Sequence, residues 1–87
     1  MNILTKINHP KFKVIADIHK WVEKNMDGKI TQIHNDKPKI GFTLVMAPYI
    51  PSITYITLPI TEIIKITDSF IHFKTEKYEY KLQQFEL

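Results

Sequence analysis

The stretch from Ile53 to Leu82 constrains this chain most, because it is a succession of short β-type segments separated by turn residues. Isoleucine, threonine, tyrosine and phenylalanine dominate these segments, and such side chains suit the pleated, half-buried surface of a sheet. Asp68-Ser69 and Glu76-Lys77 have the composition of tight turns. The pattern predicts four strands, at Ile53–Leu58, Glu62–Thr67, Phe70–Thr75 and Tyr78–Leu82.

The last two of these strands alternate apolar and polar residues. In the third strand, Ile71 and Phe73 alternate with His72 and Lys74. Because successive side chains of a strand point to opposite faces, one face of the sheet is predicted to be buried and the other polar. An antiparallel sheet of this kind either leaves its polar face in water or uses it to contact a partner.

A helix is predicted ahead of these strands, over Lys11–Met26. Pro10 suits the first helical turn, and Asp27-Gly28 suits the C-terminal end, where glycine adopts the left-handed conformation. Six apolar residues recur at the helical period and form one stripe, namely Val14, Ile15, Ile18, Trp21, Val22 and Met26. This stripe needs a surface to cover, and the sheet is the surface available.

Two further strands and a stiff loop are predicted between the helix and the main run. Lys29–His34 and Lys39–Ala47 are expected to form a hairpin around the turn residues Asn35–Pro38. Ala47–Ser52 holds two prolines, which cannot lie inside a strand ladder, so it is predicted to be a loop. The expected fold is α+β, with one N-terminal amphipathic helix packed on a roughly five-stranded antiparallel meander sheet, in a single domain spanning residues 1–87.

The composition argues against several kinds of catalytic and metal site. The chain has no cysteine, which removes disulfides, thiolate catalysis and cysteine-ligated metals. Two glycines are too few for a phosphate-binding glycine-rich loop, and none of the four histidines has the spacing of zinc ligands. The two serines lie at turn or loop positions, outside any nucleophile motif. We therefore expect no cofactor, no metal and no enzyme activity.

The charge of the chain is modestly basic. The net charge is +3, and all twelve basic residues are lysine. Arginine is the usual residue for bidentate contacts to guanine and phosphate, so its absence argues against a sequence-specific DNA reader. An AT-rich coding sequence explains the lysine excess better than selection for a basic surface does.

The hydropathy pattern predicts a cytoplasmic protein. No segment approaches the roughly 20 apolar residues of a membrane span. The residues Met1–Ile7, which suit a short strand or a loose arm, lack the apolar stretch of a signal peptide.

Candidate binding residues come from three places in the sequence. Tyr49 and Ile50 lie between two prolines, which would hold them out on a rigid loop where they could anchor an interface. Phe70, His72 and Lys74 share the polar face of one predicted strand. The third group is the basic face of the predicted helix, made by Lys13, Lys20 and Lys24.

These features favour a small non-catalytic binding protein that acts by contacting another protein or a second copy of itself. A short, cysteine-free chain with AT-rich residue usage is typical of phage and mobile-element proteins that inhibit host machinery. The first alternative is a nucleic-acid-binding domain that uses the surface lysines and exposed aromatic rings. The second alternative is a small basic ribonuclease-type toxin, whose acid–base groups would be His72, Lys74, Glu79 and Lys81.

Overall fold

The computed structural model describes residues 1–34 and 37–85, and its regular elements there are all strands. No helix is present in these residues, so the predicted α+β fold with an N-terminal helix is wrong. Accordingly, none of the described segments provides a helix long and apolar enough to cross a membrane. The strands are β1 (Asn2–Lys6), β2 (His9–Ala16), β3 (His19–Lys24), β4 (Ile30–His34), β5 (Thr43–Met46), β6 (Tyr55–Ile56), β7 (Ile60–Ile66), β8 (Phe70–Thr75) and β9 (Glu79–Gln84).

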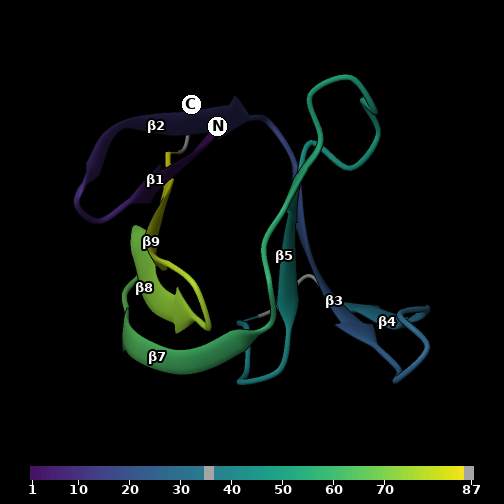
Figure 1. Cartoon of the computed structure of the whole chain (residues 1–87). Helices are drawn as coiled ribbons and strands as arrows, with labels where there is room; N and C mark the ends of the chain where they lie inside the picture. Colours follow the sequence, from purple (N-terminus) through teal and green to yellow (C-terminus); the bar gives the residue numbers. More distant parts are fainter. Residues whose placement is uncertain (35–36, 86–87) are drawn as a thin grey trace.

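The strands form two antiparallel sheets that face each other (Figure 1). The larger sheet has the order β2-β1-β9-β8-β7, and the smaller has the order β4-β3-β5-β6. Two backbone hydrogen bonds connect the start of β7 to the residues that precede β5. Gly41 N donates to Ile60 O at 2.8 Å, and Ile60 N donates to Phe42 O at 2.8 Å. The two sheets are therefore joined along one side as well as packed face to face.

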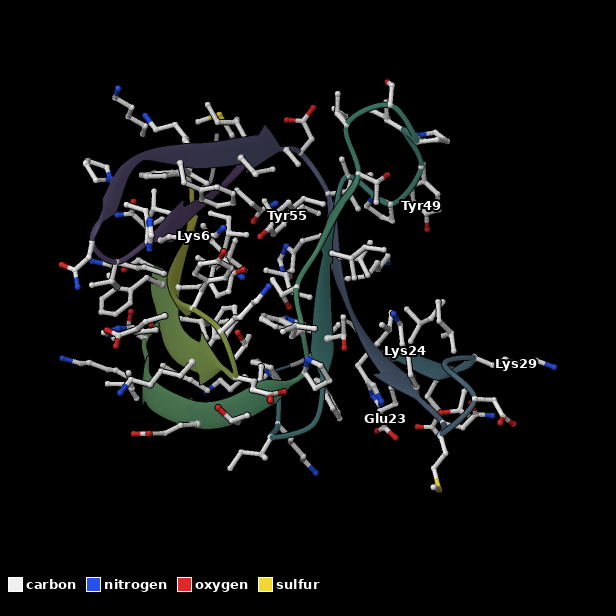
Figure 2. The ribbon with its side chains drawn as sticks, in the orientation of Figure 1. Lys6, Glu23, Lys24, Lys29, Tyr49 and Tyr55 are labelled. Carbon is white, nitrogen blue, oxygen red and sulfur yellow. The ribbon has the colours of Figure 1, made fainter. Side chains whose placement is uncertain are left out.

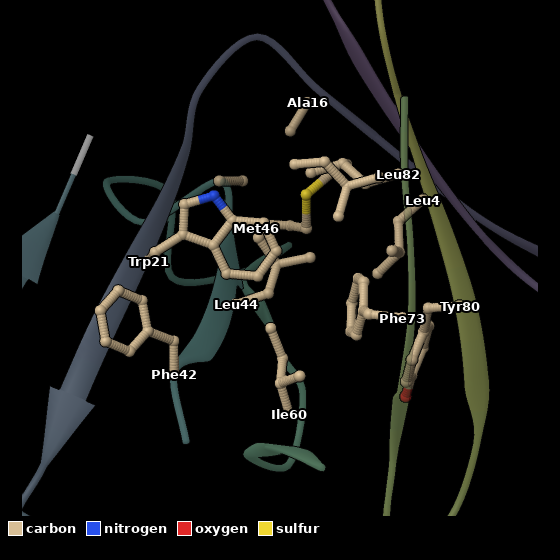
Figure 3. Packing of buried hydrophobic residues seen from close by; sticks show 12 residues of the cluster. Leu4, Ala16, Trp21, Phe42, Leu44, Met46, Ile60, Phe73, Tyr80 and Leu82 are labelled. Atoms are coloured by element: carbon tan, nitrogen blue, oxygen red, sulfur yellow. The ribbon is translucent and has the colours of Figure 1, made fainter. Parts of the chain in front are cut away.

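The hydrophobic core lies between the two sheets (Figure 3). Trp21 contributes from the smaller sheet and is only 1% exposed. Its ring meets Phe73 of the larger sheet edge to face, with ring centroids 5.7 Å apart, and Phe73 stacks on Tyr80 at 5.3 Å. Burying each large side chain of this kind contributes roughly 1.5–3 kcal/mol. Because the second sheet supplies the cover that the first one needs, no helix is required to complete the core.

The segment predicted to be a helix forms β2 and β3 instead. Its residues also fit the period of a strand, because Phe12, Val14 and Ala16 lie two positions apart and alternate with the exposed residues Lys13 and Ile15. These three residues pack in or against the core, whereas Ile18 and Met26 of the helical stripe are 46% and 104% exposed. β-branched side chains, which are frequent here, favour strands over helices. The pairing of β2 with β1 and of β3 with β5 then decides in favour of strands.

The turn residues Asp27-Gly28 connect β3 to β4 rather than ending a helix. Gly28 has φ +80°, so the predicted left-handed conformation is confirmed within a different element. The turn is fixed by Asn25, whose side-chain oxygen accepts hydrogen bonds from the backbone N–H groups of Asp27 and Lys29, both at 3.0 Å. A glycine that suits a helix end also suits a hairpin turn, because both need positive φ.

The predicted hairpin between Lys29–His34 and Lys39–Ala47 is not formed. Their counterparts β4 and β5 both pair with β3, which lies between them. Strand β5 is shorter than predicted because the chain turns at Gly41, where φ is +96°. Of the predicted turn, Asn35-Asp36 lies outside the described residues. The strand predicted at Ile53–Leu58 is likewise reduced to the two residues of β6.

The strand predictions for the C-terminal part of the chain are confirmed. Strand β8 has the predicted bounds, and β7 and β9 overlap their predicted ranges. The predicted alternation is confirmed as well, because Ile71 and Phe73 are buried while His72 and Lys74 are half-buried on the other face. Strands β7, β8 and β9 form the expected meander, but β1 then adds beside β9, so the first and last strands meet inside the larger sheet.

Candidate functional site

An apolar cleft lies between the loop that follows β5 and the bend that joins β2 to β3. The cleft has a volume of about 370 Å³. One wall comes from the bend, with Ile15 and Ile18, and the other comes from the loop, with Tyr49, Ile50 and Ile53. Ala47 N donates to the carbonyl of Ile18 at 3.0 Å, so a backbone hydrogen bond holds the two walls together at the base.

The loop is held in one shape by its own hydrogen bonds. The hydroxyl oxygen of Thr54 lies 2.7 Å from the carbonyl oxygen of Ala47 and 2.9 Å from that of Ile50, so the two carbonyls share its one proton. Two further backbone bonds, from Ile50 N to Ala47 O and from Ile53 N to Ile50 O, close successive turns. Ala47 has φ +52°, a conformation that costs a non-glycine residue roughly 1 kcal/mol and persists where the surroundings enforce it. The prolines at both sides of Tyr49 and Ile50 restrict the backbone further.

The apolar side chains around the cleft are largely in solvent. Tyr49 is 71% exposed and Ile50 is 51% exposed, and Figure 2 shows Tyr49 on the outer side of the loop. Ile15, Ile18 and Ile53 are each about half exposed. Exposed apolar residues that gather in one patch mark an interaction site more often than residues scattered singly. The sequence indicated Tyr49 and Ile50 as interface candidates, and the structure adds the three isoleucines to them.

The second group of predicted site residues lies on the outer face of the larger sheet. His72 Nε2 is 2.6 Å from Glu79 Oε2, and Lys74 Nζ is 3.7 Å from Glu79 Oε1. The ammonium of Lys81 lies 4.3 Å from the centroid of the Phe70 ring. These residues share one face, as the alternation predicts, and they contact one another across β8 and β9. Glu79 therefore pairs with both His72 and Lys74, and the Lys81 ammonium covers one side of the Phe70 ring.

The third predicted group, the basic helix face, does not exist because the helix does not. Lys13 belongs to β2 in the larger sheet, whereas Lys20 and Lys24 belong to β3 in the smaller one. The three lysines therefore do not form the continuous stripe that a helix would have presented. Their apparent clustering came from the helical period alone.

The histidines have other neighbours. His34 Nε2 lies 2.9 Å from Glu23 Oε1, and the His34 ring stacks on Phe42 at 4.5 Å. His19 is half-buried, and burial, reinforced by the charges of Lys20 and the amino terminus, lowers its pKa below the usual value near 6.5. Across residues 1–34 and 37–85, no three histidine, cysteine, aspartate or glutamate side chains gather as metal ligands would.

Comparison of the chain with models of known protein families, with curated proteins and with solved structures finds no match.

Proposed function

We propose that this protein is a small non-catalytic binding protein that receives an apolar side chain of a partner protein in the cleft between the β2–β3 bend and the Ala47–Thr54 loop. The observation that carries the proposal is the hydrogen-bonded loop, which presents Tyr49 and Ile50 in solvent at the edge of an apolar cleft. Tyrosine is enriched among the residues that dominate interface energies, particularly where it meets a well-packed pocket. Covering a partner's surface in this way would also block it, as an inhibitor does.

The hydrogen bonds of the loop support this proposal because they lower the entropic cost of binding a partner. Immobilising a flexible side chain or loop on association costs roughly 0.5–1.5 kcal/mol per side chain. The Thr54 hydroxyl and the two flanking prolines already fix the backbone that carries Tyr49 and Ile50. Less ordering is then needed when a partner arrives, so more of the contact energy appears as affinity.

The charge at the rim indicates the chemistry of the partner. Asp17 lines the cleft and is exposed, and it is the charged side chain among the described residues that form it. The partner segment that suits this cleft therefore carries a large apolar side chain, with a lysine or arginine close to it. An acidic segment would meet like charge at the rim.

The proposal is tested by comparing Tyr49→Ser and Ile50→Ser with Ile40→Ser as bait in pull-downs. Ile40 is 67% exposed on the turn before β5, so its replacement controls for the loss of an exposed isoleucine elsewhere. We expect one partner to be retained by the wild type and by Ile40→Ser and to be lost from both cleft variants. With the purified partner, truncation of a dominant interface residue costs about 2 kcal/mol, or roughly thirtyfold in Kd.

Equal retention by all three variants would exclude the cleft. A change of solution mass on Ile50→Ser, from dimer to monomer, would show instead that a second copy of the chain occupies it. Both results contradict the proposal of a different partner protein. Matching circular dichroism spectra of the three variants establish that the loss of binding is local.

A further inference from the structure

A second hollow, separate from the cleft, opens at the turn between β1 and β2. It has a volume of about 580 Å³, within the range of small-molecule sites. The side chains that line it include two lysines, a histidine and two aromatic rings, namely Lys6, Lys11, His9, Phe12 and Tyr78. Asn8 lies at the tip of the turn with φ +66°, a conformation that asparagine tolerates well.

Lys6 has an unusual environment for a lysine. It lies two residues after the fully buried Leu4 in β1, so its side chain starts on the inner face of the sheet. Its ammonium is 3.7 Å from the ring centroid of Tyr78 and 4.2 Å from that of Phe12. Tyr55, from the other sheet, lies 5.8 Å away, and Figure 2 shows Lys6 and Tyr55 on the sides of the two sheets that face each other.

The basic groups at this hollow lack an acidic partner among the described residues. Within the part of the chain that the structure describes, no carboxylate forms an ion pair with Lys6, His9 or Lys11. The ammonium of Lys6 is therefore held by ring faces, through cation–π attraction, and no carboxylate in residues 1–34 and 37–85 pairs with it. This contrasts with the outer face of the same sheet, where Glu79 pairs with both His72 and Lys74.

The charges decide which ligand the hollow suits. The aromatic rings would attract a cation, but Lys6 already occupies that position, and Lys11 at the rim would repel a second cation. An anion instead supplies the missing counter-charge, and lysine is a common phosphate ligand. The remaining surfaces of Tyr78 and Phe12 suit a flat ring, because aromatic side chains stack on bases regardless of their identity.

We infer that this hollow binds a phosphate-bearing ligand with a flat ring, of the nucleotide class. Lys6 and Lys11 contact the phosphate, and the aromatic side chains contact the ring. The inference is independent of the protein-binding cleft, because it uses different residues and a different charge.

The test is a titration followed by the amide resonances of the protein, with adenosine monophosphate as the probe. We expect saturable shifts confined to residues 6–12 and the neighbourhood of Tyr78. Lys11→Gln is the main variant, because Lys11 is exposed and its replacement leaves the core untouched. It should weaken binding about fivefold, the effect of one ion pair at a protein surface. Lys65→Gln, an exposed lysine of β7, is the matched control and should bind as the wild type does.

Inorganic phosphate and adenosine, titrated separately, divide the ligand into its two parts, and each should bind at least tenfold more weakly than the whole nucleotide. If inorganic phosphate bound as tightly as the nucleotide, recognition of the ring would be overturned. If adenosine bound as tightly as the nucleotide, the role of the lysines would be overturned. A short single-stranded oligonucleotide that shifts the same residues more strongly would support the inference and identify a strand as the source of the phosphate. No saturable shift, or equal effects of Lys11→Gln and Lys65→Gln, would overturn it.

Discussion

The hydrogen bond between Tyr55 and Tyr80 provides the sharpest test of how the two sheets are joined. The two hydroxyl oxygens are 2.8 Å apart, one from β6 and one from β9. Tyr80 is 2% exposed, whereas Tyr55 is half-buried. Removing the hydroxyl of Tyr55 is therefore not equivalent to removing that of Tyr80. Tyr55→Phe leaves the hydroxyl of the buried Tyr80 without its partner, while Tyr80→Phe does the same to the hydroxyl of the half-buried Tyr55.

The expected costs follow from this asymmetry. Leaving a buried donor without a partner costs roughly 1–3 kcal/mol, whereas losing an ordinary hydrogen bond costs about 0.5–1.5 kcal/mol. Tyr55→Phe should therefore destabilise the protein more than Tyr80→Phe. The double variant should cost less than the sum of the two, because no hydroxyl remains to be satisfied.

The assay is urea unfolding at pH 7, followed by the fluorescence of Trp21. Trp21 is the only tryptophan in the sequence and is buried between the sheets, so its emission reports their separation. All three variants keep the aromatic rings, which limits the change to the hydroxyl groups. Equal costs for the two single variants, or a double variant whose cost equals their sum, would contradict the asymmetry.

The burial of Tyr80 also leads us to expect that the protein loses stability in alkali. Burial, together with the hydrogen bond to Tyr55, raises the pKa of the Tyr80 phenol well above its usual value near 10.0. The unfolded chain therefore loses this proton above about pH 10 while the folded chain keeps it, so stability falls as the pH rises. One such group contributes a slope of up to about 1.4 kcal/mol per pH unit. Unfolding of Tyr80→Phe, measured from pH 9 to 11, should show a shallower decline than that of the wild type.

Two further predictions concern acid and the β3–β4 turn. Because burial lowers the pKa of His19, the unfolded chain binds the extra proton first, so stability should fall as the pH drops below about 6.5. His19→Gln should flatten that decline in urea titrations at pH 7 and 5, and an unchanged decline would assign it to other groups. Gly28→Ala should cost roughly 1 kcal/mol, because φ is +80° and an added Cβ meets no atom within 4 Å. Gly28→Asn should cost less, and equal costs in thermal unfolding would refute a purely backbone effect.

The sequence predicted the last three strands well because the signals there are local. Strands β8 and β9 have short, alternating patterns bounded by turn residues, and adjacent strands pair with each other. The region of β2 and β3 was ambiguous, because Val14 and Val22 fit a helical stripe as well as a strand. Local periodicity does not show that β2 has β1 as a partner, or that β3 lies between β4 and β5. Those pairings depend on residues far away in the sequence, and tertiary context overrides local propensity there.

The candidate sites also differ in how far local sequence could predict them. Phe70, His72 and Lys74 could be placed on one face because a strand fixes the direction of alternate side chains. The flanking prolines predicted that Tyr49 and Ile50 would be exposed, and both are. The cleft itself could not be predicted, since Ile15 and Ile18 reach it only because the chain bends between two strands in different sheets. The basic hollow carries no motif either, because its residues come from β1, β2 and the segment before β9.

Strand β1 lies between β2 and β9, and the contact from the amino group of Met1 to the carbonyl of Phe85 spans 84 positions. During synthesis, the hairpin of β1 and β2 therefore emerges from the ribosome long before the strand that completes its sheet. Until β9 arrives, one edge of β1 has unsatisfied backbone groups and the apolar side of the hairpin lacks its final neighbour. Folding of the larger sheet must wait until β9 has been synthesised, and a contact between strands so distant in sequence makes that step slow.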